Sequence, residues 1–381
     1  MRKRFELVIE GEWVDPLEGV REGFIGIRNG VIEAISEGKL EGVRKILLGE
    51  QEIVFPGFID PHVHLREPGW EDKEDFLTGT QAAAKGGVTA VLDMPNNRIP
   101  TVSRERVLEK MGLSKKSLID VFFLGGVWDG KEIGKMGSLV KGYKAYMGRT
   151  TGHLLLGKDD FEKLGGILGK AGKPVVFHVR EPEEEGIREA EELGERYGFP
   201  VHIAHISSEA GLRKIKKASC EVAPHHLLFT EKDMEKNPFL TMKPPLGNEK
   251  DKKALLDGIK EGKIKMLATD HGPHLPAEKE SGAFGLPGLE AYGNVVCWLI
   301  EEGIDKKLLA GLTSYNAANL FSLEKRGRIK EGFFADMAVL ALEREEVIKK
   351  PFRSKCGWSP YEGMAFPGGI KHTIFRGKLL D

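Results

Sequence analysis

Between Ile53 and Asp270 the sequence alternates short apolar segments with longer polar segments, and eight of the apolar segments can be counted. Continuous apolar runs, as at residues 88–92 and 175–177, are typical of strands that are buried on both faces of a parallel sheet. Three polar segments predict helices between them, at residues 77–85, 158–170 and 183–197. Eight such units predict a closed β/α barrel, in which catalytic residues gather at the carboxyl ends of the strands.

The two ends of the chain have a different pattern. Short alternating runs at residues 5–9, 31–35 and 373–375 are separated by turns that contain glycine, such as Asn29-Gly30. This pattern predicts antiparallel strands, which we expect to pair into one small β-sandwich. The predicted division is therefore a TIM-like (β/α)8 barrel at residues 53–324, and a composite β-sandwich formed by residues 1–52 and 325–381.

Composition excludes several classes of protein. Of 381 residues, 40% are hydrophobic and 30% are charged, with a net charge of −1, which predicts a globular chain without affinity for nucleic acid or anionic membranes. No apolar run approaches the roughly 18 residues of a membrane span, and the N-terminus lacks the apolar core of a signal peptide. Cys220, Cys297 and Cys356 are far apart and odd in number, so they predict no disulfide framework and a cytoplasmic location.

Two histidines end the first predicted barrel strand. Side chains two residues apart in a strand face the same way, so His62 and His64 can reach one metal ion from the barrel mouth. Asp60, just before them, is a candidate to orient a histidine. The alternative is that they are two polar residues at a strand end, without a metal.

Lys144 lies within the fourth predicted strand, among mostly apolar residues. Its side chain can extend to solvent, or it can be buried, which would lower its pKa and favour the neutral amine. A neutral amine reacts with carbon dioxide to give a carbamate. A carbamate of Lys144 would be a carboxylate-like ligand able to bridge two divalent ions.

Further donors end three later strands: His178 the fifth, His205 the sixth and Asp270 the eighth. His202 competes with His205, and we expect it to be a packed or hydrogen-bonded histidine. His225-His226 follows the seventh strand and is expected to be structural. The complete donor set suits two divalent ions, with zinc favoured. Such a pair activates a shared water and polarises a carbonyl, which predicts metal-assisted hydrolysis of an amide-like bond.

Several motifs together resemble dihydroorotases, in the cyclic amidohydrolase branch of the amidohydrolase superfamily. The first is His-Val-His-Leu-Arg-Glu-Pro-Gly at residues 62–69. The others stand in the same order along the chain, at residues 79–87, 94–97, 221–226, 268–274, 284–290 and 332–336. The resemblance spans nearly the whole sequence.

The resemblance implies a fold, a reaction and a set of site residues. The fold is a TIM-like barrel with a β-sandwich, and the reaction is the reversible cyclisation of N-carbamoyl-L-aspartate to L-dihydroorotate in pyrimidine biosynthesis. Two Zn²⁺ ions, bridged by carbamylated Lys144 and a hydroxide, would be held by His62, His64, His178, His205 and Asp270. Asp270 would also be the catalytic acid and base. The substrate's free carboxylate would be bound by Arg66, Asn96 and His274, and a guanidinium matches a carboxylate with two parallel hydrogen bonds.

The sequence departs from the family pattern at two places. Some dihydroorotases have an aspartate where this chain has Lys144. A lysine at this position resembles the pattern of hydantoinases and allantoinases instead. The segment that usually reads Asn-Pro-Pro-Leu-Arg has Lys243 in place of the asparagine and Gly247 in place of the arginine. This puts the contacts to the pyrimidine ring in question.

Two alternative functions stay open at this point. One is a related cyclic amidohydrolase, an allantoinase or a hydantoinase/dihydropyrimidinase, which would not need Arg66. The other is a non-catalytic scaffold for aspartate transcarbamoylase. Predicted partners are a small-molecule substrate, a second copy of the chain in a homodimer, and aspartate transcarbamoylase. Residues 275–288, rich in glycine and proline, are expected to close over the substrate.

Overall fold

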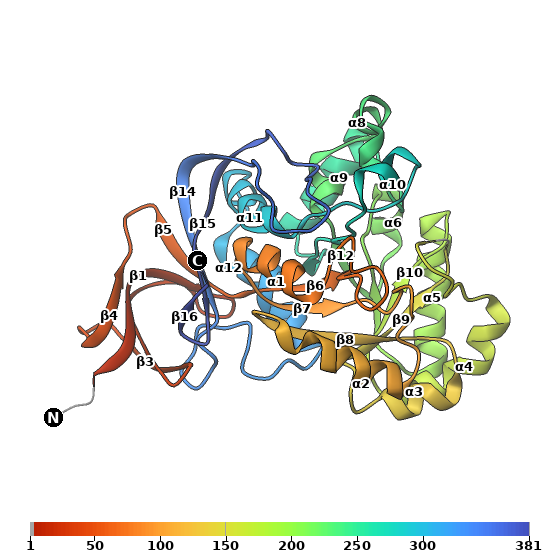
Figure 1. The fold of residues 1–381 in the computed structure, drawn as a ribbon, viewed down its shortest axis with the longest axis horizontal. Helices are drawn as coiled ribbons and strands as arrows, with labels where there is room; N and C mark the ends of the chain where they lie inside the picture. Colours follow the sequence, from red (N-terminus) through yellow and green to blue (C-terminus); the bar gives the residue numbers. More distant parts are fainter. Residues whose placement is uncertain (1–3, 149, 381) are drawn as a thin grey trace.

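Eight parallel strands form one sheet whose order follows the chain from β6 to β13. The computed structural model describes residues 4–148 and 150–380, and Figure 1 shows this sheet at the centre of the larger part of the molecule. A parallel bridge between Val63 and His271 joins the two edges of the sheet. The predicted barrel is therefore confirmed. Its strands are β6 (Phe58–Val63), β7 (Val88–Asp93), β8 (Asp120–Gly126), β9 (Gly142–Tyr146), β10 (Val175–His178), β11 (Val201–Ile203), β12 (Ser219–Val222) and β13 (Met266–Leu267).

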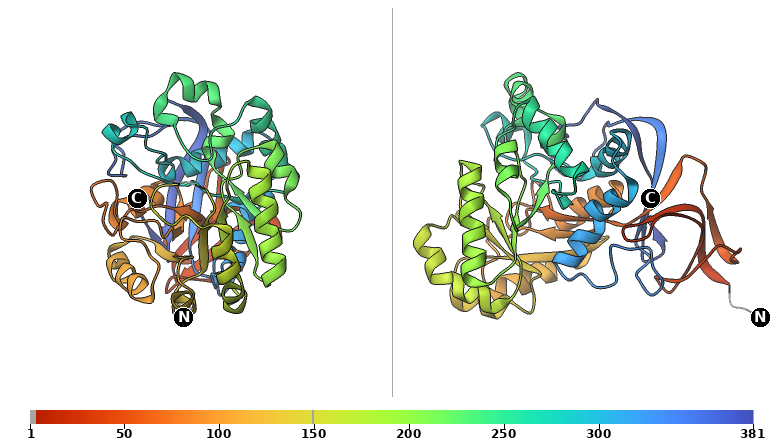
Figure 2. Two further views of the ribbon diagram at one scale, coloured as in Figure 1. Left: turned by 90° about the vertical axis from the view of Figure 1, so that its right-hand side faces the viewer. Right: turned by 180° about the vertical axis from the view of Figure 1, so that it is seen from behind.

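Helices surround the barrel (Figures 1 and 2). The first of them, α1, begins after Asp75, whose carboxylate accepts a hydrogen bond from the N–H of Thr78. Glycines with positive φ end α4 and α5, at Gly172 and Gly198. The helices are α1 (Phe76–Lys85), α2 (Arg104–Leu113), α3 (Gly130–Met136), α4 (Lys158–Ala171), α5 (Glu183–Tyr197), α6 (Glu209–Lys214), α7 (Pro224–Leu228), α8 (Glu231–Lys236), α9 (Glu249–Lys260), α10 (Pro276–Glu280), α11 (Tyr292–Glu301), α12 (Lys306–Ala310) and α13 (Asn316–Leu320).

Side chains on alternate positions of the barrel strands belong to two different hydrophobic clusters. Val175 and Phe177 pack in the large cluster that also contains side chains of the surrounding helices. Val176, between them, packs in another cluster with Leu92 and with Phe321, which follows α13. Both faces of each strand are thus covered, which explains why the strands read as continuous apolar runs.

The terminal segments pair in one mixed sheet beside the barrel, as Figure 2 shows. The main path runs β16-β15-β14-β5-β1-β2-β3, and β4 pairs with β1. Its inward side chains form a separate hydrophobic cluster that includes Leu7, Ile25 and Val339. The sheet comprises β1 (Phe5–Asp15), β2 (Gly19–Arg28), β3 (Val31–Ser36), β4 (Gly42–Leu47), β5 (Glu52–Pro56), β14 (Met337–Val347), β15 (Ala365–Phe375) and β16 (Lys378–Leu379).

The chain crosses from the terminal sheet into the barrel at Gly57. Strand β5 pairs with β14 and β1, so the expected boundary at residue 53 falls inside a strand of the terminal sheet, and the barrel begins at Phe58. After β14 the chain returns over the barrel before β15 begins. There Trp358 donates a hydrogen bond from Nε1 to the carbonyl of His274 (2.8 Å). Among the residues that the structure describes, no helix combines the length and apolar character that a membrane span needs.

We predict that Gly57→Ala destabilises the protein, because a Cβ at residue 57 would lie 2.2 Å from Oγ1 of Thr89. Overpacking of this kind costs about 1–3 kcal/mol, so the midpoint of thermal unfolding, followed by circular dichroism, should fall. The matched control is Gly166→Ala in α4, where the added Cβ meets nothing within 4 Å. That change should leave the midpoint unchanged or raise it, because alanine favours a helix by about 0.5–1 kcal/mol over glycine. Equal midpoints for Gly57→Ala and wild type would contradict the prediction.

Candidate active site

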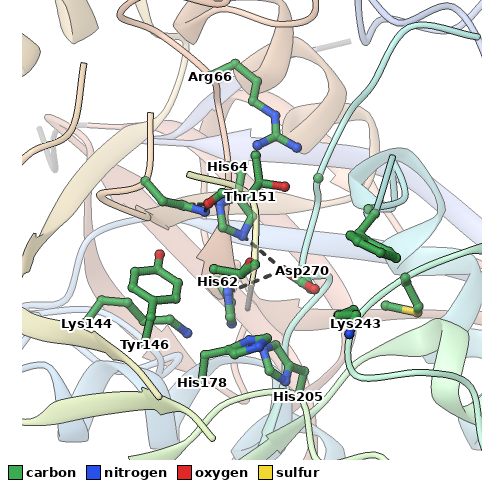
Figure 3. A pocket seen from close by; sticks show the side chains of 16 residues that line it. His62, His64, Arg66, Lys144, Tyr146, Thr151, His178, His205, Lys243 and Asp270 are labelled. Carbon is green, nitrogen blue, oxygen red and sulfur yellow. Dashed lines mark hydrogen bonds and ion pairs between the residues drawn. The ribbon is translucent and has the colours of Figure 1, made fainter. Parts of the chain in front are cut away.

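Two histidines and an aspartate meet at the mouth of the barrel (Figure 3). Oδ1 of Asp270, after β13, lies 3.3 Å from Nε2 of His62 and 3.1 Å from Nε2 of His64. One ligand atom from each of the three residues lies within 4.8 Å of the other two. This arrangement can hold a metal ion, because the three donors face a common point and come from two rigid strand ends.

A second pair of imidazoles faces this group. Nδ1 of His178, on β10, lies 2.8 Å from Nε2 of His205, which follows β11. The ring centres of His205 and His62 are 5.3 Å apart. Lys144 on β9 lines the same pocket, so the structure brings together all six residues that the sequence analysis selected as metal ligands.

Lys144 is buried, and its amine has an aromatic neighbour, the Tyr146 ring, at 5.5 Å from the ring centre. Its side chain is 1% exposed, and its Nζ makes no hydrogen bond within the described part of the chain. Burial lowers the pKa of Lys144 to about 8, against the opposing effects of Glu221 and Asp270. A pKa of about 8 makes the neutral amine, the form that reacts with carbon dioxide, more accessible near physiological pH than in an exposed lysine.

The donor set suits a divalent metal. Burial lowers the pKa values of His64 and His178 to about 3, so both imidazoles are neutral and offer lone pairs. Nδ1 of His205 is buried and has no hydrogen-bond partner among the described residues. Burial acts to raise the pKa of Asp270, but the histidines around it outweigh burial and hold this pKa well below its usual range. Neutral imidazoles beside an ionised carboxylate are suitable ligands for a divalent transition metal.

Glu221 of β12 orients His62, a contact that the sequence analysis missed. Its carboxylate contacts Nδ1 of His62 and accepts a hydrogen bond from Nε2 of His202 (3.0 Å). His202 also pairs through Nδ1 with Oγ of Ser219 (2.8 Å), so it is the hydrogen-bonded histidine that we expected. A glutamate within the buried strand β12 was an available signal, because an unpaired charge there would be costly.

Asp60 has a different role from the one that the sequence suggested. Its Oδ1 accepts from the backbone N–H of His62 and of Thr269, both at 3.1 Å, and does not contact an imidazole. The carboxyl group links the first and last strands of the barrel, because His62 belongs to β6 and Thr269 follows β13. His225 and His226 lie on the short helix α7, both buried, and neither is among the residues that line the pocket.

Three site residues have left-handed backbone conformations. The φ angles are 66° at Arg66, 35° at His205 and 47° at Asp270. Such values are uncommon outside glycine and cost on the order of 1–3 kcal/mol each, and they concentrate at functional sites where the surrounding structure maintains them. Each turn follows a barrel strand, and all three side chains line the pocket.

Arg66 and its neighbours form one wall of the pocket. Arg66 is 3% exposed, and its Nε donates to the carbonyl of Pro273 (3.0 Å). Nη2 of Arg66 lies 3.2 Å from Nε2 of His274. Asn96 pairs through Oδ1 with Nδ1 of His64 (2.8 Å), which joins this wall to the candidate metal ligands. Although burial lowers the pKa of Arg66 to about 10, the guanidinium stays charged at neutral pH and presents a fixed cation.

The two departures from the family motif lie in different places. Lys243 lines the pocket, with its Nζ 5.4 Å from the ring centre of Phe284. Gly247 is not among the lining residues and lies against Asp251 of α9. Only Lys243 therefore changes the chemistry of the pocket itself, where it adds an amine group.

A barrel of this kind, with histidines, an aspartate and a buried lysine around one pocket at its strand ends, defines a class of hydrolases. Residues 53–380 match the model of the Amidohydrolase family, and the chain therefore belongs to this family. The resemblance drawn from the sequence motifs is confirmed. Enzymes of this class act on small molecules.

Curated relatives and solved structures agree with this assignment. The chain is 34% identical over 391 residues to a dihydroorotase of Pyrococcus horikoshii, a match that covers 98% of this chain and 92% of the relative. It is 29% identical over 428 residues to an allantoinase of Bacillus velezensis, with 99% and 94% covered. The fold is similar to that of an L-hydantoinase from Arthrobacter aurescens, with a TM-score of 0.93, 24% identity, and coverage of 99% of this chain and 96% of that one.

We predict that Glu221→Ala weakens metal binding, because the change removes the carboxylate that orients His62. Loss of such a partner typically costs 10–100-fold in metal affinity. The affinity can be measured by titrating the purified variant with Zn²⁺ against a chelator. Ser219→Ala is the control, since it removes the partner of His202 at Nδ1 and a hydrogen bond to the carbonyl of Val201, but no contact with His62, and should bind Zn²⁺ as wild type does. Unchanged affinity in a folded Glu221→Ala protein would show that the contact is dispensable.

Proposed function

We propose that this protein catalyses the reversible cyclisation of N-carbamoyl-L-aspartate to L-dihydroorotate, the dihydroorotase reaction of pyrimidine biosynthesis. The observation that carries the proposal is that buried Arg66 and Asn96 both line the pocket that holds the candidate metal ligands, while His274 contacts the Arg66 guanidinium without being among the lining residues. A free carboxylate on the substrate would pair with this fixed cation. Seven relatives named dihydroorotase, 30–34% identical to the chain, support the same reaction.

Two Zn²⁺ ions are the proposed cofactors. One would be held by His62, His64 and Asp270, and the other by His178 and His205. The amine of Lys144 would add to carbon dioxide and release one proton, and the resulting carbamate would bridge the two ions. Once bound, the ions would supply an activated water or hydroxide and polarise the carbonyl of the scissile amide.

Asp270 is the proposed acid and base. Its low pKa makes it a carboxylate at neutral pH, so in the hydrolytic direction it can accept the proton of the attacking water. It would then give this proton to the ring nitrogen as the amide C–N bond breaks. In the direction of synthesis, Asp270 would take a proton from the ureido nitrogen while that nitrogen attacks the carbon of the protonated side-chain carboxyl group. Asp270 would return this proton to the departing hydroxyl group, which would leave as water.

Arg66, Asn96 and His274 would orient the substrate. A bidentate pair of the guanidinium with the free carboxylate fixes both the position and the rotation of the ring. His274 is neutral, because burial and the charge of Arg66 lower its pKa to about 3. It can therefore complete the site without adding a charge.

The allantoinase reaction is the second candidate, because an allantoinase is among the relatives and Lys144 matches the pattern of that branch. Allantoin, hydantoin and dihydrouracil carry no carboxylate, so they would leave the buried charge of Arg66 unpaired in the complex. A non-catalytic scaffold for aspartate transcarbamoylase would not need candidate metal ligands that converge on one pocket, so their convergence disfavours that alternative. The homodimer, an association with aspartate transcarbamoylase and a cytoplasmic location stay predictions.

We predict that the purified, Zn²⁺-loaded protein converts L-dihydroorotate and N-carbamoyl-L-aspartate and prefers them to allantoin and dihydrouracil. Arg66→Met should lower kcat/KM for dihydroorotate by about 10–10²-fold, because one charged hydrogen-bonding partner is lost. Arg98→Met, a nearby arginine that is not among the lining residues, is the control and should keep wild-type kinetics. A preference of wild type for allantoin or dihydrouracil would overturn the assignment.

We predict that Lys144 is carbamylated in the active enzyme. Metal-free protein reconstituted with Zn²⁺ in buffer free of carbon dioxide should be inactive, and bicarbonate should restore turnover. Lys144→Gln should retain fewer Zn²⁺ ions per chain and lose activity, because the bridge cannot form. Lys141→Gln, which changes an exposed contact near the start of the same strand, should respond to bicarbonate as wild type does. Full activity in the absence of carbon dioxide would rule the carbamate out.

A further inference from the structure

Asp93 and Lys110 form an ion pair that is completely buried. Both side chains are 0% exposed, and Nζ of Lys110 lies 2.6 Å from Oδ2 of Asp93. Removing two charges from water is costly, so a buried ion pair is a poor way to gain stability. The other contacts of the two side chains show which parts of the structure the ion pair connects.

Lys110 reaches from α2 to the loop that follows β7. Its Nζ donates hydrogen bonds to the carbonyl of Met94 (2.8 Å) and to Oδ1 of Asn97 (2.7 Å). Together with the ion pair to Asp93, these contacts place three oxygen atoms around the ammonium group. The loop between Met94 and Asn97 is thus held at both of its ends, and Asn96 lies within it.

The same group of side chains also holds the loop that follows β6. Oδ1 of Asp93 accepts from the N–H of Leu65 (2.8 Å), and Nδ2 of Asn97 donates to the carbonyl of Glu67 (2.8 Å). Arg66 stands between Leu65 and Glu67 in the chain and has the left-handed φ of 66°. Its strained backbone is therefore fixed on both sides by residues that Lys110 contacts directly.

We infer that Lys110 is a positioning residue for recognition of the substrate's carboxylate. Through Asp93 and Asn97 it fixes Arg66 and Asn96 relative to each other, although it touches neither. Both residues face the pocket, and the guanidinium accepts only a narrow range of carboxylate positions. This role rests on the proposed function, because it assigns Arg66 and Asn96 to the carboxylate.

Lys110→Met tests the inference in the Zn²⁺-loaded enzyme with L-dihydroorotate as substrate. The KM should rise by about tenfold or more, while kcat changes by less than about threefold and the Zn²⁺ content stays at the wild-type value. A change confined to KM indicates lost substrate binding and not damage to the reacting groups. A general loss of structure would lower kcat and metal content together.

Two further variants make the test decisive. Asn97→Ala leaves the ion pair intact but removes the link between Lys110 and Glu67, and it should also raise KM. If Lys110→Met does not fold, the KM of Asn97→Ala tests the positioning role instead. Arg328→Met breaks another largely buried ion pair, with Asp15 in the terminal sheet, and should lower the thermal midpoint without changing KM.

The possible outcomes distinguish a failure of the positioning role of Lys110 from a failure of the proposed function. Wild-type turnover of dihydroorotate with unchanged KM in folded Lys110→Met and Asn97→Ala proteins would overturn the positioning role alone. Loss of Zn²⁺ from both variants would also overturn it, because the network would then support the metal ligands. No turnover of dihydroorotate by wild type would overturn the proposed function itself, and the positioning role with it.

Discussion

The contact between the first and the last strand of the barrel sets the geometry on which the site depends. The N–H of His64 donates to the carbonyl of His271 (2.8 Å), and buried Asp60 accepts from the backbone N–H of both His62 and Thr269. These bonds tie together two segments that are about 200 residues apart in the chain. Without them, His62 and His64 would have no fixed relation to Asp270.

Burial then determines the chemistry of the groups that the barrel brings together. Out of water, His64 and His178 are neutral, and the pKa of Lys144 falls to about 8. Arg66 stays a cation, because even a pKa of about 10 is far above neutral pH. The same barrel mouth therefore provides neutral donors for a metal on one side and a fixed positive charge for an anion on the other.

Side chains behind the pocket keep these groups in place. Glu221 contacts His62 from β12, and Lys110 supports from α2 the loops that carry Arg66 and Asn96. The return of the chain from the terminal sheet adds the hydrogen bond from Trp358 to the carbonyl of His274. The terminal sheet is thus connected to the wall of the pocket as well as to the outside of the barrel.

The sequence by itself determined the main elements and the reactive residues. Apolar runs predicted β7 and β10, and the predicted helix at residues 183–197 matches α5. The reactive residues could be selected because they stand at or near strand ends: His62, His64, Lys144, His178, His205 and Asp270. The sequence could do so because strand periodicity and the parallel order place those ends on one side of a barrel. Only the tertiary structure decided that Glu221, and not Asp60, orients His62, and that Lys110 reaches the loops around Arg66. Those contacts join residues far apart in the chain, and they depend on strand register and side-chain direction, which local sequence patterns do not encode.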